Sequence, residues 1–437
     1  MAEAQASQFV SDKRTHTCYR VAIALVGLCL FGATWILWTP QTVYPQIPWF
    51  AWGCDVPGWV DYICFGLTLA SLVVLLIPPI PKTVERTAWI VLGASLLASC
   101  LLDQHRFQPW AYQLMIVSVL MAVCRDALLI KLLRAIVLSI YVYSAISKLD
   151  YSFCQDLGQV FLSTLAQQMR LADDPAVSRL AASLALVFPL FELLVACLIM
   201  SQFTRRFGVA CAVIMHSLLI LIVSSWGLNH EAGVMLWNIL FIAQAIILFW
   251  PKIPKPQSAD ANRTALDPSP EDNPIPKRLS LAEQLTLVFA ILVMVAPLGE
   301  SWGKFDHWPG WALYASHVSG AQVLLSPWSE DRLPEELFFY TEEISDEFGM
   351  KSLNIRAWSL DQTHVPGYPQ DRFEIAVAKA VAQKYGLKTH MQVVVSEQAS
   401  RFSGYREERH LIGLSKIQEE SKRYFFNTNC RRIYLED

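Results

Sequence analysis

The sequence predicts an all-α polytopic membrane helix bundle of about eight or nine transmembrane helices, with a small C-terminal soluble domain of α/β or α+β type. Composition, the length of the apolar runs and the distribution of basic residues support this prediction. The chain has 437 residues, of which 54% are hydrophobic and only 17% charged, and its mean hydropathy is +0.34. A soluble domain carries about a quarter charged residues.

The apolar residues are concentrated in runs long enough to cross a bilayer, which takes roughly 20 residues per helix. The expected spans, with ends uncertain by roughly 2–4 residues, are 19–38, 59–78, 87–102, 109–124, 129–147, 180–200, 207–225, 233–250 and 281–297. The third, fourth and ninth spans are short. The first is too long for a signal peptide and lacks a small-residue cleavage site, so we expect it to be retained as a helix.

Lysine and arginine residues indicate the orientation of the chain, because they concentrate in cytoplasmic loops. With the N-terminus in the cytoplasm, the inner segments hold fifteen of these residues and the outer loops before the linker hold four. Every inner segment follows this bias. The sequence therefore predicts an integral membrane protein with a cytoplasmic N-terminal segment, 1–18, and an extracytoplasmic C-terminal domain.

The remaining organisation follows from composition. A bundle over 19–250 is followed by a cytoplasmic linker, 251–280, that contains seven prolines and is expected to be semi-rigid or disordered. The additional helix 281–297 leads to the soluble domain 298–437. In that domain "SLNIRAWSL" and "MQVVVSE" alternate like strands, and "FEIAVAKAVAQKYGLK" has helical spacing that ends at Gly386.

Several function classes are disfavoured by composition. The net charge of −3 and the isoelectric point near 6.3 do not indicate a nucleic-acid partner. The ten cysteines are scattered, without a C-x-x-C pair or the Cys/His spacing of a zinc site, so no metal is predicted. Membrane lipid is the expected partner.

Charged residues occupy the short outer turn "LLDQHRFQPWAYQ" between the third and fourth spans. This turn holds Asp103, His105 and Arg106, and Pro109 suits the first position of the following helix. The turn is therefore expected to lie close to the membrane. The alternative is an exposed ion pair between Asp103 and Arg106, worth roughly 0–1 kcal/mol.

The fifth span ends outward in "YVYSAISKLDYSF". Tyr141, Ser144 and Lys148 recur at three- and four-residue steps and share one helix face, and Asp150 follows within reach of Lys148. We expect this polar stripe to face away from lipid. The alternative is that Lys148 is an ordinary snorkelling lysine at a helix end. The next outer loop contains the amphipathic stretch "DLGQVFLSTLAQQMRL", typical of an interfacial helix.

Two ionisable groups lie deeper in the apolar spans. Glu192 and His216 are roughly 20 and 15 Å from the outer ends of the sixth and seventh spans. His230 lies at the outer start of the eighth span and Asn238 one to two turns below it. A buried carboxylate must be protonated, paired or solvated, so these groups suggest a cavity that opens outward. His230 is about as well explained by simple solvation.

Three stretches resemble the horizontally transferred transmembrane domain family, within the vitamin K-dependent γ-carboxylase-like superfamily. They are "LLDQHRFQPWAYQL", "YSAISKLDYSF" and "MHSLLILIVSSWGLNHEAG", and the resemblance covers roughly residues 20–250. Related DoxX/MauE-like membrane proteins contain similar segments. Gln108-Pro109-Trp110 replaces an Asn-Asn-His of the family, and Ser147 replaces a second lysine.

The resemblance implies that Lys148 acts as the base that takes a proton from a reduced isoprenoid quinone. A membrane-embedded pocket would supply the desolvation that favours a neutral amine. The function expected is a quinone- or lipid-linked redox or carboxylase-like enzyme. The alternative is a DoxX/MauE-like redox-associated protein, or a non-enzymatic scaffold or transport protein that presents the C-terminal domain.

The candidate site residues fall into two groups. The expected catalytic residues are Lys148, His105, Glu192 and His216. The expected pocket residues are Asp103, Arg106, Tyr141, Ser144, Asp150, His230 and Asn238. Convergence of Lys148, Glu192 and His216 within one cavity would favour chemistry, whereas dispersal toward lipid or solvent would favour a scaffold.

Overall fold

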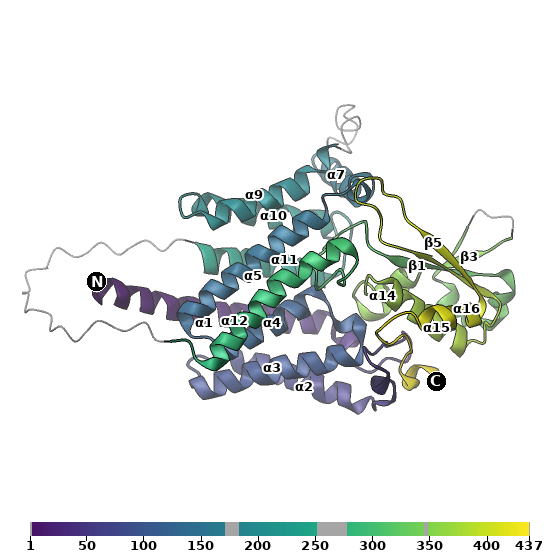
Figure 1. The fold of residues 1–437 in the computed structure, drawn as a ribbon, viewed down its shortest axis with the longest axis horizontal. Helices are drawn as coiled ribbons and strands as arrows, with labels where there is room; N and C mark the ends of the chain where they lie inside the picture. The colour runs from purple at the N-terminus through teal and green to yellow at the C-terminus, as the bar shows by residue number, and fades with distance from the viewer. Residues whose placement is uncertain (1, 171–182, 251–277, 345–347, 437) are drawn as a thin grey trace, which may run out of the picture.

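The computed structural model describes residues 2–170, 183–250, 278–344 and 348–436, with side chains from residue 12 onward. The proline-rich linker up to residue 277 and the first residues of the sixth predicted span lie outside the described residues. Figure 1 shows the helices running side by side in one half of the molecule and the sheet at the other end, with the N-terminus on the far side from the sheet.

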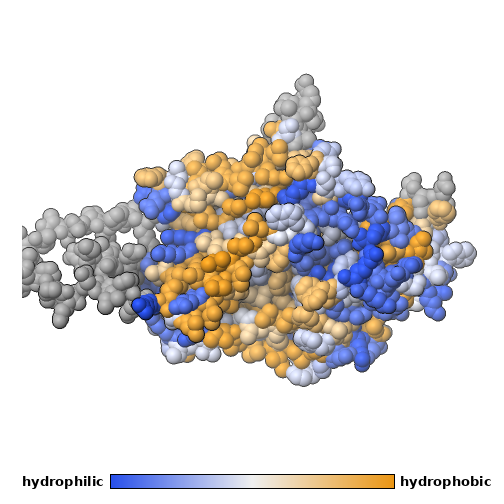
Figure 2. All heavy atoms as spheres, in the orientation of Figure 1, coloured by the Kyte–Doolittle hydropathy of each residue, from blue (hydrophilic) through white to orange (hydrophobic). Residues whose placement is uncertain are grey.

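Seven helices of the described chain are long and apolar enough to cross a membrane. They are α1 (Ala2–Ala33, apolar from Asp12), α2 (Trp59–Leu76), α3 (Lys82–Leu102), α5 (Asp126–Ser147), α10 (Arg205–Val223), α11 (Ala232–Gln244) with the π-turn η4 (Ala245–Phe249), and α12 (Leu281–Val295) with the 3-10 turn η5 (Ala296–Trp302). On the face that Figure 2 shows, apolar side chains cover most of the helical region, whereas hydrophilic ones gather over the sheet region. A multipass helical membrane protein, as predicted, accounts for both features.

Two further apolar helices, α4 (Pro109–Val123) and α9 (Val187–Met200), are shorter. They correspond to the fourth and sixth predicted spans. Length and composition therefore support seven crossings, and the count of about eight or nine is not confirmed by this criterion. α4 begins at Pro109 as predicted, because proline has no N–H to lose at the first helical position.

The helical core is built from aromatic and aliphatic side chains, with small polar contacts between neighbouring helices. Trp38 and Trp110 pack edge to face around Phe31. Thr68 of α2 and Ser95 of α3 share a hydrogen bond of 2.9 Å, which satisfies two hydroxyls that lipid could not.

Helix α12, which follows the linker, is fixed to the bundle at both ends. Ser280 and Glu283 form a capping box at its start, and Arg125 Nε lies 2.7 Å from Glu283 Oε1. Near its other end, the Tyr143 hydroxyl donates to the carbonyl oxygen of Met294 at 2.7 Å. The chain after the linker is thus part of the same helical body.

The C-terminal region contains one antiparallel sheet of five strands in the order β2-β3-β1-β4-β5. The strands are β1 (Gly320–Leu325), β2 (Thr341–Glu343), β3 (Lys351–Leu353), β4 (Met391–Ser396) and β5 (Glu408–Ile412). Val323 of the central strand pairs with Leu353 on one side and Val393 on the other. An antiparallel sheet with helices packed against it has the α+β form of the two predicted.

Helices α14 (Ile355–Thr363), α15 (Asp371–Lys384) and α16 (Gly413–Ser421) accompany the sheet. The strand predicted over "SLNIRAWSL" is wrong beyond Leu353, because the Asn354 side chain accepts a hydrogen bond from the Ala357 N–H and starts α14. The helix and strand predicted on either side of Gly386 are confirmed, and Gly386 has a positive φ of 62°.

The remaining short elements connect these parts. They are the helices α6 (Tyr151–Gln155), α7 (Leu157–Gln168), α13 (Glu335–Phe338) and α17 (Arg432–Leu435), and the 3-10 turns η1 (Trp35–Trp38), η2 (Ala51–Asp55), η3 (Gln104–Arg106) and η6 (Pro327–Arg332). α7 forms within the predicted amphipathic stretch.

The C-terminal region packs directly on the loop that follows α1 and on the turn η3. Tyr44 and Ile47 belong to the same buried cluster as Phe373 and Trp358 of the sheet region. Beneath this cluster, Asp61 at the start of α2 lies between two arginines: Arg106 Nη1 at 2.5 Å and Arg431 Nη1 at 2.7 Å. All three side chains are fully buried, so an ionic network ties the two halves of the molecule together.

Candidate functional site

Lys148, the C-cap residue directly after α5, forms a buried ion pair with Glu192 of α9. Its Nζ lies 2.9 Å from Oε2 and 3.1 Å from Oε1 of the carboxylate. The same nitrogen donates to the carbonyl oxygen of Ser144 at 2.8 Å and contacts its hydroxyl at 2.6 Å. The lysine side chain is 5% exposed and the glutamate side chain 12%. The pair therefore lies inside the protein, and a snorkelling lysine is not what the structure shows.

A second chain of hydrogen bonds begins about two turns before Lys148, on the same face of α5. The Tyr141 hydroxyl lies 2.8 Å from His216 Nε2 on α10, and His216 Nδ1 lies 2.8 Å from Asn238 Oδ1 on α11. The Asn238 amide nitrogen donates to the carbonyl oxygen of Val234, which assigns Oδ1 as the acceptor toward His216. His216 thus carries its proton on Nδ1 and accepts from Tyr141 at Nε2.

These contacts bring together six of the residues that sequence patterns single out. The polar stripe of Tyr141, Ser144 and Lys148 points into the bundle, as its helical spacing predicts. Glu192 meets the stripe at Lys148, and His216 meets it at Tyr141. Residues from four helices, α5, α9, α10 and α11, therefore form one polar cluster in an apolar core.

His105 and Asp103 belong to a different part of the molecule. Asp103 Oδ1 accepts from the backbone N–H groups of His105 and Ile47, which caps the turn η3. His105 Nε2 donates to the carbonyl oxygen of Pro366 at 3.0 Å, so it joins the turn to the C-terminal region. Burial raises the pKa of Asp103 to about 6 and lowers that of His105 to about 4. Both residues hold the two halves together and neither bonds to Lys148.

Arg106 is also a packing residue, and the exposed pair with Asp103 considered from the sequence is wrong. Its guanidinium is fully buried and pairs with Asp61. It also donates to the carbonyl oxygens of Leu37 at 2.8 Å and Thr39 at 3.0 Å. Buried carbonyl oxygens need a hydrogen-bond donor, and the Arg106 guanidinium supplies one to each of these two. Arg106 therefore fixes the loop after α1 to the bundle.

The two remaining predicted pocket residues bond to the C-terminal region. Asp150 caps α6 by accepting from the Phe153 N–H, and its other oxygen lies 2.8 Å from His317 Nδ1. His230 Nδ1 lies 3.2 Å from the Tyr314 hydroxyl, and partial burial lowers the pKa of His230. Neither side chain contacts the Lys148 cluster through a hydrogen bond that the structure describes.

A second polar cluster was not predicted. Glu300, His307 and His317 are all buried, and one potential ligand atom from each lies within 4.8 Å of the others. His307 Nδ1 and His317 Nε2 lie 2.9 and 2.8 Å from the same oxygen, Glu300 Oε1. Arg401 donates to Glu300 Oε2 at 3.0 Å. Spacings of seven and ten residues match no familiar motif, which explains why sequence patterns missed this cluster.

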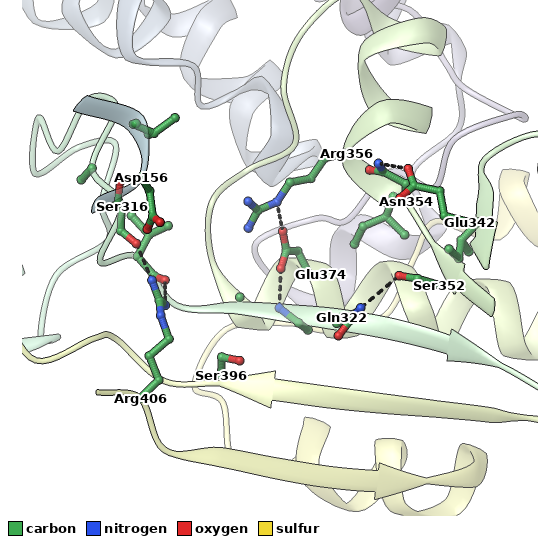
Figure 3. A pocket seen from close by; sticks show the side chains of 17 residues that line it. Asp156, Ser316, Gln322, Glu342, Ser352, Asn354, Arg356, Glu374, Ser396 and Arg406 are labelled. Carbon is green, nitrogen blue, oxygen red and sulfur yellow. Dashed lines mark hydrogen bonds and ion pairs between the residues drawn. The ribbon is translucent and has the colours of Figure 1, made fainter. Parts of the chain in front are cut away.

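Cavities lie elsewhere. One of about 480 Å³ opens beside the sheet, where Arg356 and Arg406 approach from different elements and Glu374 bonds to Arg356 Nε at 2.8 Å (Figure 3). Another, of only about 10 Å³, lies in the bundle beside Gln113. Lys148 lines neither of these two cavities.

Comparisons with known proteins add no family to this description. No protein-family model matches the chain, and neither a curated protein nor a solved structure shows a significant match to it. The class supported by the fold is therefore a multipass helical membrane protein with a sheet-containing C-terminal region.

Proposed function

We propose that this protein is a membrane-embedded enzyme in which Lys148 and Glu192 take a proton from a lipid-soluble substrate. The observation that carries the proposal is the contact of Lys148 Nζ with both carboxylate oxygens, at 2.9 and 3.1 Å, inside an apolar bundle. Ionisable groups within membrane helices are expensive and mark functional sites by default. The family resemblance of the segment around Lys148 points in the same direction.

The pair has two states that differ by the position of one proton. In the first, Lys148 is an ammonium and Glu192 a carboxylate. In the second, the proton has moved from Nζ to a carboxylate oxygen, which leaves a neutral amine and a neutral acid. A low-dielectric interior disfavours separated charges, so the neutral pair is more accessible there than in water. The neutral amine is then the base: it takes a proton from the substrate and becomes an ammonium again. Glu192 loses the proton that it had received from Nζ to water, which restores the resting ion pair and releases one proton for each proton taken from the substrate.

The hydrogen-bonded chain of Tyr141, His216 and Asn238 is a positioning element in this proposal. It orients the neutral imidazole and gives the bundle a second proton-carrying group beside the ion pair. Phe241 stacks on the imidazole at 5.0 Å with nearly parallel planes, which limits its rotation. His105, by contrast, is assigned to packing and not to catalysis.

The candidate substrate is a reduced isoprenoid quinone, whose phenolic O–H suits an amine base. The chemistry of the residues fits such a group, but the described cavities do not contain Lys148 in their lining. We therefore derive no step through a bound quinone. The proposal is limited to the exchange of a proton at Nζ and to a substrate that enters from lipid.

We further propose nine crossings, with the C-terminal region outside the cytoplasm. α3 ends beside the C-terminal region, because Arg106, just after α3, and Arg431 pair with the same carboxylate, Asp61. α5 ends beside the same region, because Arg401 donates a hydrogen bond to the Ile146 carbonyl oxygen. α4 must then cross the bundle between them. α10 also ends there, where His230 meets Tyr314, so α9 must cross as well. The excess of basic residues at the opposite ends supports a cytoplasmic location for those ends.

The test uses the full chain in lipid nanodiscs loaded with a reduced menaquinone. Oxidation of the quinol by oxygen gives quinone and hydrogen peroxide, and the appearance of quinone is followed by absorbance. We expect the protein to accelerate this reaction at least tenfold over empty nanodiscs, and Lys148→Met to abolish the acceleration. Lys131→Met is the matched control, because Lys131 is an exposed lysine on the same helix. No acceleration by the unaltered protein, or an equal loss in both variants, would refute the proposal.

A second candidate is a non-enzymatic scaffold that presents the C-terminal region. The observation that favours it is that the three protons of the Lys148 ammonium already have acceptors, in Ser144 and Glu192. A scaffold predicts that organic extracts of the purified protein contain no quinone by mass spectrometry and that Lys148→Met changes stability alone.

A further inference from the structure

The strongest unassigned feature is the buried cluster formed by Glu300, His307 and His317 at the boundary between bundle and C-terminal region. Glu300 lies in η5, at the end of the helical segment that begins with α12, and the two histidines follow in the loop that leads to β1. Gly310 allows this loop to pass closely, because a Cβ there would lie 2.9 Å from side-chain atoms of Glu300. The fold therefore brings the three side chains together.

We propose that Glu300, His307 and His317 bind a divalent transition-metal ion, with Zn²⁺ as the best match. Two imidazole nitrogens and one carboxylate oxygen form a ligand set that zinc accepts, at roughly 2.0–2.2 Å per ligand, with a water molecule in the fourth position. The three donor atoms lie within 4.8 Å of one another, which is the span that a single ion bridges after small side-chain adjustments. All three residues are at most 3% exposed.

The surroundings of the cluster resemble the outer shell of a metal site. The His317 Nδ1 faces Asp150 Oδ2 at 2.8 Å, so a carboxylate fixes the ring and leaves Nε2 toward the ion. The second oxygen of Glu300 is held by Arg401 at 3.0 Å, which leaves Oε1 as the ligand atom. Two of the three ligands are thus oriented by groups that do not themselves need to move.

Binding changes the protons of the cluster in a defined way. Without an ion, both nitrogens of His317 face carboxylate oxygens and both carry protons. An ion at Nε2 displaces one proton to solvent and leaves the proton on Nδ1. His307 changes tautomer, because its Nδ1 becomes a ligand and its Nε2 takes the proton. The long 3.3 Å contact from the Ser319 N–H to that Nε2 is lost.

The ion would fix the turn that carries Lys148 to the C-terminal region. Asp150 lies two residues after Lys148, and Arg401 donates to the carbonyl oxygen of Ile146 at 2.8 Å. The Tyr151 N–H donates to the Arg401 carbonyl oxygen at 2.8 Å. The cluster, together with Asp150 and Arg401, therefore holds the chain just before and just after the end of α5. The role of the ion is structural, and it does not depend on the function proposed for Lys148.

The first measurement is the zinc content of the purified full chain, with any affinity tag removed, after loading with Zn²⁺ and dialysis. Elemental mass spectrometry is expected to find one zinc per chain. The double variant His307→Ala/His317→Ala is expected to retain less than a tenth of that amount. His364→Ala is the matched control, since His364 is a 40% exposed histidine outside the cluster, and it should retain one zinc.

A second measurement guards against variants that fail to fold. Asp150→Asn keeps all three ligands, and weakening of their outer shell is expected to reduce zinc affinity 10- to 100-fold in competition with a chelator. Cobalt substitution of the unaltered chain should give the visible absorption of a four-coordinate ion. Zinc below one-tenth per chain in the unaltered protein, or equal zinc in the double variant, would overturn the proposal and leave a hydrogen-bonded ion network at this position.

Discussion

Replacing Arg431 by methionine is expected to destabilise the protein by about 3 kcal/mol, the lower end of the range for breaking a buried ion pair. The Arg431 guanidinium is fully buried and bonds to Asp61 at 2.7 Å, to the Gln46 side chain at 3.0 Å and to the Val56 carbonyl oxygen at 2.7 Å. The variant leaves these acceptors without that donor. Arg106 remains beside Asp61, which is why the lower end of the range applies.

Asp61→Asn is expected to be worse, at about 5 kcal/mol, because one substitution removes the counter-charge of two buried arginines. The matched control is Arg432→Met. Arg432 pairs with Asp55 at 2.7 Å, but the two side chains are 70% and 57% exposed. An exposed pair contributes about 0–1 kcal/mol. The structure thus predicts a steep difference between neighbouring arginines.

The assay is thermal unfolding of each purified variant in detergent, followed by tryptophan fluorescence. At this chain length about 1 kcal/mol corresponds to on the order of 2 °C, so Arg431→Met should lower the midpoint by about 6 °C and Arg432→Met by no more than about 2 °C. Equal shifts for the two arginine variants, or an Asp61→Asn midpoint above that of Arg431→Met, would refute the assignment of a buried network.

Three further predictions concern other positions. Lys148→Met is expected to destabilise the bundle by about 3–5 kcal/mol by leaving the Glu192 carboxylate buried and unpaired, and adding Glu192→Gln should recover most of that loss. Since burial lowers the pKa of His105 to about 4, its contribution is complete above pH 6.5, and about 3 kcal/mol is lost as the pH falls from 6.5 to 4. Gly320→Ala should lower the free energy of unfolding by about 1–3 kcal/mol, because the Cβ of the new alanine would lie 2.9 Å from Glu374 Oε2.

Each of these predictions has a control. The double variant Lys148→Met/Glu192→Gln should have a higher melting temperature than Lys148→Met alone. A lower melting temperature would contradict the pairing. His105→Gln keeps a donor without a titrating ring, so its melting temperature should depend less on pH between 6.5 and 4. Gly66→Ala, in α2 with no atom within 4 Å of the new Cβ, should be neutral or stabilising by up to about 1 kcal/mol; a loss as large as that of Gly320→Ala would argue against the steric explanation.

Apolar length and helical spacing were sufficient to predict most of the fold. The long runs form helices near the expected positions, and the polar stripe of α5 faces inward because a three- and four-residue repeat fixes one helix face. Strand prediction failed beyond Leu353, where a single asparagine side chain caps a helix. Local alternation does not reveal such a cap, because it is decided by one side-chain hydrogen bond.

The candidate site was predicted only in part, for a physical reason. Glu192 and His216 were identified by the cost of burying polar groups, which a sequence displays directly. The turn residues His105 and Arg106 show the same polarity, yet they bond to Pro366, Leu37 and other partners that only the tertiary structure brings near. Glu300 lies three residues beyond the predicted span 281–297, and both histidines follow in a loop, where a histidine or glutamate is ordinary composition.

The bond between Asp61 and Arg431 joins residues 370 positions apart. During synthesis the carboxylate enters the bundle long before its second partner exists, while Arg106 is made only 45 residues later. Such distant contacts form late, since closing a long loop costs entropy before any bond repays it. The nascent protein therefore passes through an interval in which Asp61 is paired with Arg106 alone, and a chain truncated before position 431 would remain in that state.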